Sequence, residues 1–197
     1  MKFVLFATLF CAATLACAQE PETQAPPTLE QIEAQIAATP DDPMLHYRKC
    51  QALFAAGKQQ EAIDHAKVAM DAFIKANNNL AWMLLGSIKT DKYRIDVHYN
   101  MGPKERAEKR DMIVKPYSFR VWTLDEEPKL ERTLDFEIAY FGGEAMTAAI
   151  GSTTPRGRNN FGMLETDADF ATVKAKVLNI LKTNEGPVAR TVFPNNP

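Results

Sequence analysis

Three stretches of strict two-residue alternation constrain the fold of this chain more than any other feature. Apolar and polar side chains alternate through residues 93–99, 117–122 and 134–140. Because successive side chains of a β-strand point to opposite faces, each stretch predicts a strand with one apolar and one largely polar face. Strands of that kind form antiparallel sheets that are covered on one side only.

The same region also predicts a hairpin and two further strands. Gly142 and Gly143 offer the positive φ angles that a tight hairpin turn requires. They lead into an apolar run at residues 146–150, and residues 161–164 predict a weaker fifth strand. The expected arrangement is an antiparallel meander.

A C-terminal helix is expected to cover the apolar face of this sheet. Thr166 with Asp169 predicts its start, as an acidic variant of the capping box. Because the strands cluster instead of alternating with helices, the predicted fold class is α+β, with sheet and helix within residues 91–183. Residues 184–197 are expected to be an irregular tail. One helical stripe holds the apolar residues Phe170, Val173, Val177, Ile180 and Leu181.

Residues 28–90 show helical periodicity instead. Thr28 is a predicted N-cap, and Pro43 stands at a first-turn position after a break in the pattern. Gly57 is expected to end the second helix. The following helix carries a single stripe that predicts a packed face, formed by Ala62, Ala66, Ala69, Met70 and Phe73.

The spacing within this helical part carries a family resemblance. Pro40 and Gly57 stand as the closing proline of one repeat and the mid-turn glycine of the next, and small residues follow at Ala62 and Ala69. Residues 82–86 then read Trp-x-x-Leu-Gly, the opening of a further repeat. Residues 28–90 therefore resemble a tetratricopeptide-type array: a final helix, one helical hairpin and the first helix of another.

The resemblance has departures and implications. Lys49 and Cys50 stand where Leu-Gly is typical, and Tyr93 falls where the third unit's glycine belongs. An array needs about three repeats to be stable alone, so this one is expected to lean on the sheet that follows. The resemblance implies a surface that binds a protein or peptide.

The N-terminus predicts export. Residues 1–18 form a short apolar segment with one positive charge, ending in the cleavage pattern Ala16-Cys17-Ala18. Residues 19–27 are then a flexible leader, and the mature protein is periplasmic or secreted, without a transmembrane helix. The alternative is a lipoprotein anchored to a membrane by acylation of Cys17.

Composition limits the partners and the chemistry. The full chain has a formal net charge of −2, and the absence of a basic excess argues against nucleic acid. Cleavage after Ala18 leaves Cys50 as the one cysteine, which we interpret as a small core residue, so the apolar core must hold the fold.

No catalytic, cofactor or metal motif is found. His46, His65 and His98 lie in three different predicted elements, and no pair has ligand spacing; His46 and His65 could approach across the helical hairpin, but no acid or thiol cluster accompanies them. We also find no nucleophile elbow, phosphate loop or dinucleotide motif. The sequence therefore predicts a non-catalytic protein with neither cofactor nor metal.

The best candidate binding segment is residues 151–160, interpreted as a long hairpin loop. Arg156 and Arg158, beside Asn159 and Asn160, offer planar paired donors for a carboxylate or phosphate. The alternative is a solvated loop without a ligand. We expect a protein or peptide partner, or alternatively a small ligand in a pocket formed by the sheet and this segment; an enzyme whose site the sequence does not show is a third reading.

Overall fold

The computed structural model describes residues 26–76, 82–100, 111–154 and 157–192. The predicted export signal, residues 1–18, and all but the end of the leader lie outside this part of the chain. Seven strands form a single antiparallel sheet in chain order, which confirms the predicted α+β class. The strands are β1 (Met83–Lys89), β2 (Tyr93–Tyr99), β3 (Met112–Thr123), β4 (Leu130–Phe141), β5 (Glu144–Thr154), β6 (Gly157–Leu164) and β7 (Ala189–Val192).

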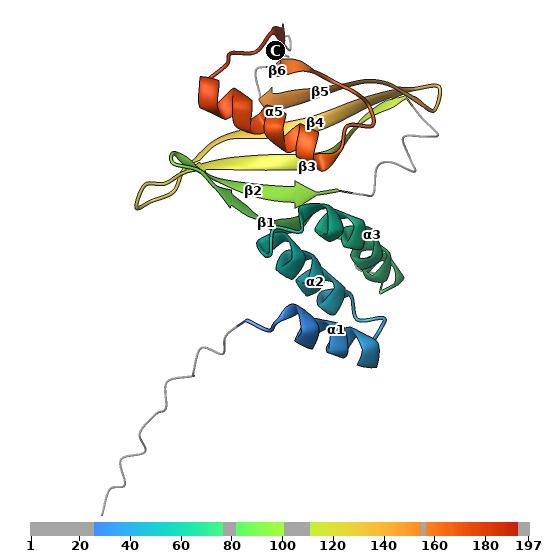
Figure 1. The fold of residues 1–197 in the computed structure, drawn as a ribbon. Coiled ribbons are helices and arrows are strands. Elements are labelled where there is room, and N and C mark those ends of the chain that lie inside the picture. Colours follow the sequence, from blue (N-terminus) through green and yellow to red (C-terminus); the bar gives the residue numbers. More distant parts are fainter. Residues whose placement is uncertain (1–25, 77–81, 101–110, 155–156, 193–197) are drawn as a thin grey trace, which may run out of the picture.

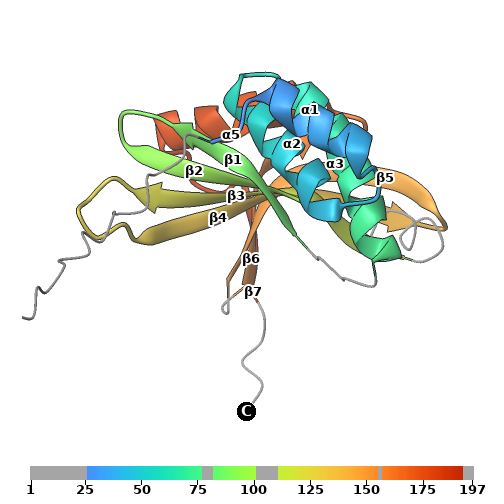
Figure 2. The ribbon, with the colours of Figure 1, turned by 90° about the horizontal axis from the view of Figure 1, so that it is seen from below.

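The described helices all lie on one side of this sheet, with α1 packed on α2. Figure 1 shows three of them before the first strand and a fourth between β6 and β7. In Figure 2 the helices share one side of the sheet, while β6 and β7 turn away from them. The described helices are α1 (Leu29–Ala38), α2 (Pro43–Ala55), α3 (Gln59–Lys75) and α5 (Phe170–Thr183).

Side-chain caps set where these helices begin. Thr28 forms a complete capping box with Gln31, and Asp42 accepts a hydrogen bond from Met44 N with Pro43 at the first helical position. Both starts confirm the predictions. The predicted start of α5 at Thr166 is wrong, because the Asp169 side chain accepts from Thr172 N at 2.8 Å and the helix begins one residue after it.

One aromatic side chain joins the helices to the sheet. Phe170, the first residue of α5, lies edge-on to Phe54 of α2, with ring centroids 6.2 Å apart. It stacks on Phe119 of β3 at 6.1 Å and meets the Tyr117 ring edge-on at 5.3 Å. Such pairs contribute about 0.5–1.5 kcal/mol each beyond the burial of their surface. The core therefore runs continuously from α2 through α5 to the centre of the sheet.

The prediction of a further helix at residues 82–86 is wrong. This run enters β1, whose residues Met83 and Leu85 are fully buried against the helices. Strand β1 pairs with β2 through a tight hairpin, with a bulge between Leu84 and Gly86. Cross-strand pairing and burial of alternate side chains outweigh the local helical spacing, so the helices of the described chain end with α3 before the sheet.

Two predicted irregular segments form strands. Within the predicted loop, residues 151–154 and 157–160 are strand: β5 runs to Thr154 and β6 starts at Gly157, with Gly151 opposite Asn160. The tail contains β7, which pairs with β6 from Gly157 to Asn160. Both were missed because their side chains are mainly polar and lack alternation, whereas backbone pairing needs neither feature.

Gly86 is predicted to be essential to the contact between α2 and β1. A methyl group at this position would overlap the ring of Phe54, which is itself held by Phe170. We expect Gly86→Ala to lower the free energy of unfolding by about 1–3 kcal/mol, measured by chemical denaturation. Gly186→Ala is the matched control, because a methyl group there meets nothing within 4 Å. Equal stability of the two variants would contradict the role of Gly86.

Candidate functional site

The face of the sheet that points away from the helices carries an unusual cluster of charges. On β4, Asp135 and Glu137 alternate with core residues, yet their side chains are only 8% and 1% exposed. Carboxylates are rarely buried this far unless they are paired, because removal from water strongly disfavours the charge. This surface, which we term the open face, is the strongest candidate for a functional site.

Two cations and a hydroxyl compensate the buried carboxylates. Lys115 Nζ lies 2.7 Å from Asp135 Oδ2 and 3.2 Å from Glu137 Oε1. Ser118 donates its hydroxyl proton to Asp135 Oδ1 at 2.7 Å. Arg158 reaches from β6, two strands away, and forms an ion pair with Glu137 Oε2. The cluster therefore contains two acids and two bases, and joins β3, β4 and β6.

The charge on Lys115 is maintained by this arrangement. Burial opposes the ammonium charge and acts to lower its pKa. The hydrogen bond and the charge of Asp135, with the charge of Glu137, outweigh burial and raise the pKa of Lys115 above its ordinary value. The lysine is thus positively charged at neutral pH.

A glycine makes room for the buried glutamate. Gly151 of β5 lies between β4 and β6, opposite both Asp135 and Asn160. A Cβ at this position would overlap the carboxylate of Glu137. The missing side chain lets Glu137 lie across β5 and reach Arg158, so this glycine is part of the site.

The cluster borders a small pocket on the open face. The pocket has a volume of about 230 Å³, and small side chains of β4 and β5 line part of it beside the polar groups. Arg158 and Lys115 keep roughly a third of their side chains exposed, so cationic groups lie above the buried acids. The lining residues are Glu137, Ala139, Thr147, Ala149, Arg158, Asn160, Met163 and Ala189.

The structure places the four predicted binding residues differently: two line the pocket, one does not, and one lies outside the described residues. Arg158 and Asn160 both line the pocket, where the Asn160 side chain accepts a hydrogen bond from Gly162 N at 2.7 Å. Asn159 does not line it, and its side-chain oxygen accepts from Arg190 Nε at 2.8 Å. Arg156 lies outside the described residues.

Sequence reasoning missed the acidic half of the site. Asp135 and Glu137 occupy the polar positions of an alternating strand, where exposed acids are ordinary. Their burial depends on Gly151 and on Arg158, which are close to them only after three strands have paired. The one signal available was Gly151, a glycine at the start of a polar segment that contains Arg158.

A serine, a histidine and an aspartate lie in line on the open face, but not in the order of a hydrolase triad. His98, Ser118 and Asp135 occupy opposite positions on β2, β3 and β4. Ser118 donates to the aspartate, whereas a serine nucleophile donates to the histidine that accepts its proton. The geometry makes Ser118 a partner of the buried acid.

Two predictions about the helical hairpin are tested by the structure. His46 Nδ1 lies 3.1 Å from His65 Nε2, which confirms that these histidines approach each other. No group of three or more potential ligands for a metal ion occurs among the described residues. Cys50 is fully buried and donates to His46 O at 3.2 Å, and burial raises the pKa of its thiol to about 12. It is thus a core residue, as predicted.

Gly151→Ala is predicted to displace Glu137 and destabilise the sheet. We expect a loss of about 1–3 kcal/mol in the free energy of unfolding, because a disturbed buried carboxylate loses its partners. In a Glu137→Ala background the same methyl group meets no carboxylate, so its cost is expected to be much smaller. Denaturant unfolding of the four proteins in this double-mutant cycle measures the difference. Additive effects would show that Gly151 and Glu137 do not interact.

The histidine pair is predicted to make stability depend on pH. His46 Nε2 lies 2.7 Å from Pro40 O and must donate to it, so His46 Nδ1 accepts a hydrogen bond from His65 Nε2–H. Burial, with the nearby charge of Lys49, lowers the pKa of His65 to about 4 from its ordinary 6.5. The unfolded chain therefore takes up a proton between these values while the folded protein does not.

Stability is consequently expected to be highest above pH 6.5 and to fall as the pH is lowered towards 4. His65→Gln retains a donor near His46 but does not titrate, so the decline over this range should be shallower. Unfolding free energies measured at several pH values test this. Parallel curves for the two proteins would contradict it.

Comparison with known proteins adds no functional assignment. No protein-family model, curated protein or solved structure matches this chain. No helix within the described residues is long and apolar enough to cross a membrane. The functional conclusion therefore depends on the side chains and cavities of this molecule.

Proposed function

We propose that this protein is a non-catalytic binding protein that holds a protein or peptide partner on the open face of its sheet. The observation that carries the proposal is the pocket beside the buried Glu137, with Arg158 and Lys115 partly exposed beside it. Charged groups that are already paired and oriented lose little freedom when a partner binds. The pocket therefore offers a rigid point of recognition.

The size of the pocket favours one side chain of a larger partner. At about 230 Å³ it lies below the range of roughly 300–1,000 Å³ that is typical of small-molecule sites. Interfaces often depend on one anchoring side chain in a pocket of this kind. The exposed edge of Arg158 favours a carboxylate, and the small Ala139 and Ala149 leave room beside it. The predicted partner residue is acidic or a chain terminus.

The second candidate is a small-ligand protein that uses the same pocket. Arg158 and Asn160, two of the four residues predicted from the sequence, line the pocket together with Glu137. A short dicarboxylate or amino acid has the right size for it. The pocket volume, below the usual range of small-molecule sites, supports a protein partner instead.

We further propose that the protein works outside the cytoplasm, based on residues 1–18. The intact mass of the mature protein tests this: it is expected to begin at Gln19. Acyl chains on Cys17 would make the protein a lipoprotein, and a mass that includes Met1 would contradict export.

The binding proposal is tested by filling the pocket. Ala139→Leu places three extra carbons among the lining residues and leaves every ion pair of the cluster in place. We expect peptides selected from a random library on the wild-type protein to bind this variant at least tenfold more weakly, measured by fluorescence anisotropy. Ala171→Leu, on the exposed side of α5, is the matched control.

Arg158→Lys tests the charge recognition separately. It keeps the positive charge beside Glu137 but removes the planar pair of donors, so carboxylate-containing peptides should lose affinity while the melting temperature changes little.

Selected peptides that bind the Ala139→Leu variant as tightly as the wild-type protein would overturn the proposed binding site. Enrichment of no peptide, with a small acid found bound in native mass spectra, would favour the second candidate.

A further inference from the structure

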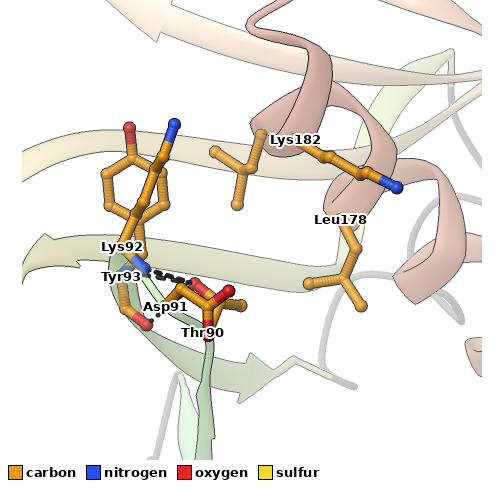
Figure 3. Close-up of a pocket in the computed structure, with 7 residues that line it drawn as sticks. Thr90, Asp91, Lys92, Tyr93, Leu178 and Lys182 are labelled. Atoms are coloured by element: carbon orange, nitrogen blue, oxygen red, sulfur yellow. Dashed lines mark hydrogen bonds between the residues drawn. The ribbon is translucent and has the colours of Figure 1, made fainter.

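A second hollow lies on the opposite side of the sheet, at the end of the core. It has a volume of about 330 Å³ and lies between the turn that joins β1 to β2 and the C-terminal half of α5. Figure 3 shows Lys92 and Tyr93 along one side of it and Leu178 and Lys182 across from them. It shares no residue with the pocket on the open face.

The walls of this hollow are mainly apolar. Leu181 is buried and Leu178 is half-buried, and with the ring of Tyr93 they continue the core towards the solvent. The backbone of the turn is already satisfied, because the Thr90 hydroxyl accepts a hydrogen bond from Tyr93 N at 3.0 Å. Thr90 N also donates to Tyr93 O at 2.9 Å. The hollow thus offers mainly apolar surface to a ligand, because Thr90 and Tyr93 at its edge already hydrogen-bond to each other.

Two lysines stand at the rim of the hollow. Lys92 comes from the turn and Lys182 from the last turn of α5, and both are exposed. Neither ammonium group forms an ion pair or hydrogen bond with any residue in the described part of the chain. Asp91 is the one acid that lines the hollow, which leaves a local excess of one positive charge. The rim therefore attracts an anion and repels a cation.

We propose that this hollow binds a free fatty acid of medium chain length. The hydrocarbon chain would lie against Leu178, Leu181 and Tyr93, and its carboxylate would be held by Lys92 and Lys182. At roughly 30 Å³ per water-sized group, the volume accommodates about ten heavy atoms, which corresponds to octanoate or decanoate. An apolar body with one anionic end matches both the walls and the rim.

Calorimetric titration of the purified protein with sodium decanoate tests the proposal. We expect one molecule to bind per chain, with affinity rising about fourfold per added methylene from hexanoate to octanoate. Decanol, which has the chain without the charge, should bind at least tenfold more weakly than decanoate. Amide chemical shifts should change at residues 90–93 and 178–182 and stay unchanged on the open face.

Paired variants locate the carboxylate. Lys92→Gln with Lys182→Gln is expected to weaken decanoate binding at least tenfold. Lys67→Gln with Lys75→Gln removes the same charge from exposed positions of α3 and should leave binding unchanged. Leu178→Asp, at a half-buried position, should abolish binding of the chain, and circular dichroism checks that the variant is folded.

Several results would overturn the proposal. They are the absence of decanoate binding to the wild-type protein, equal binding of decanol, and equal loss of affinity in the two lysine pairs. Should Leu178→Asp fail to fold, Leu178→Ala replaces it, with an expected loss of about tenfold. These outcomes do not depend on the peptide experiments, because the two hollows have no residue in common.

Discussion

The packing of Phe170 is the contact on which the rest of this structure depends. Its ring meets Phe54 of the helical hairpin and Tyr117 and Phe119 of the sheet, so three parts of the chain that are distant in sequence share one core. The next turn of α5 adds a hydrogen bond between helices, because Lys174 Nζ donates to Gln59 Oε1 of α3 at 2.6 Å. These contacts hold α2, α3 and α5 on one face, and no helix of the described residues lies on the other face (Figure 2).

That asymmetry explains why the unusual electrostatics occur on the open face. A carboxylate under a helix would need its partners inside an apolar layer, whereas Glu137 reaches lysine and arginine side chains that themselves extend towards water. Burial of the pairs still carries a desolvation cost, and a buried ion pair is weak evidence for stability. A cluster that contributes little to folding but positions charges rigidly is well suited to recognition, which is the reason for locating the partner there.

The two hollows differ in chemistry because they lie on opposite faces. The open-face pocket is small and bordered by paired charges, while the hollow between the β1–β2 turn and α5 is larger, mainly apolar and bordered by unpaired lysines. On each face of the sheet, a glycine lets a side chain from another element lie close against a strand. The ring of Phe54 lies against Gly86, and the carboxylate of Glu137 lies against Gly151. Each glycine lacks the Cβ that would occupy the space of a distant side chain.

The sequence by itself determined the α+β class, the positions of β2 to β5 and the end of β6, the Gly142–Gly143 turn and the helical stripes, because these features depend on local periodicity and on local caps. Only the tertiary structure decided that residues 83–86 are strand, that residues 151–154 pair with residues 157–160, and that β7 joins the sheet. For the site, Arg158 and Asn160 were predictable as donors in a polar segment, whereas Glu137 was not. Its burial arises from side chains on β3 and β6 that meet it across strands, and pairing between distant segments leaves no periodic trace in the chain.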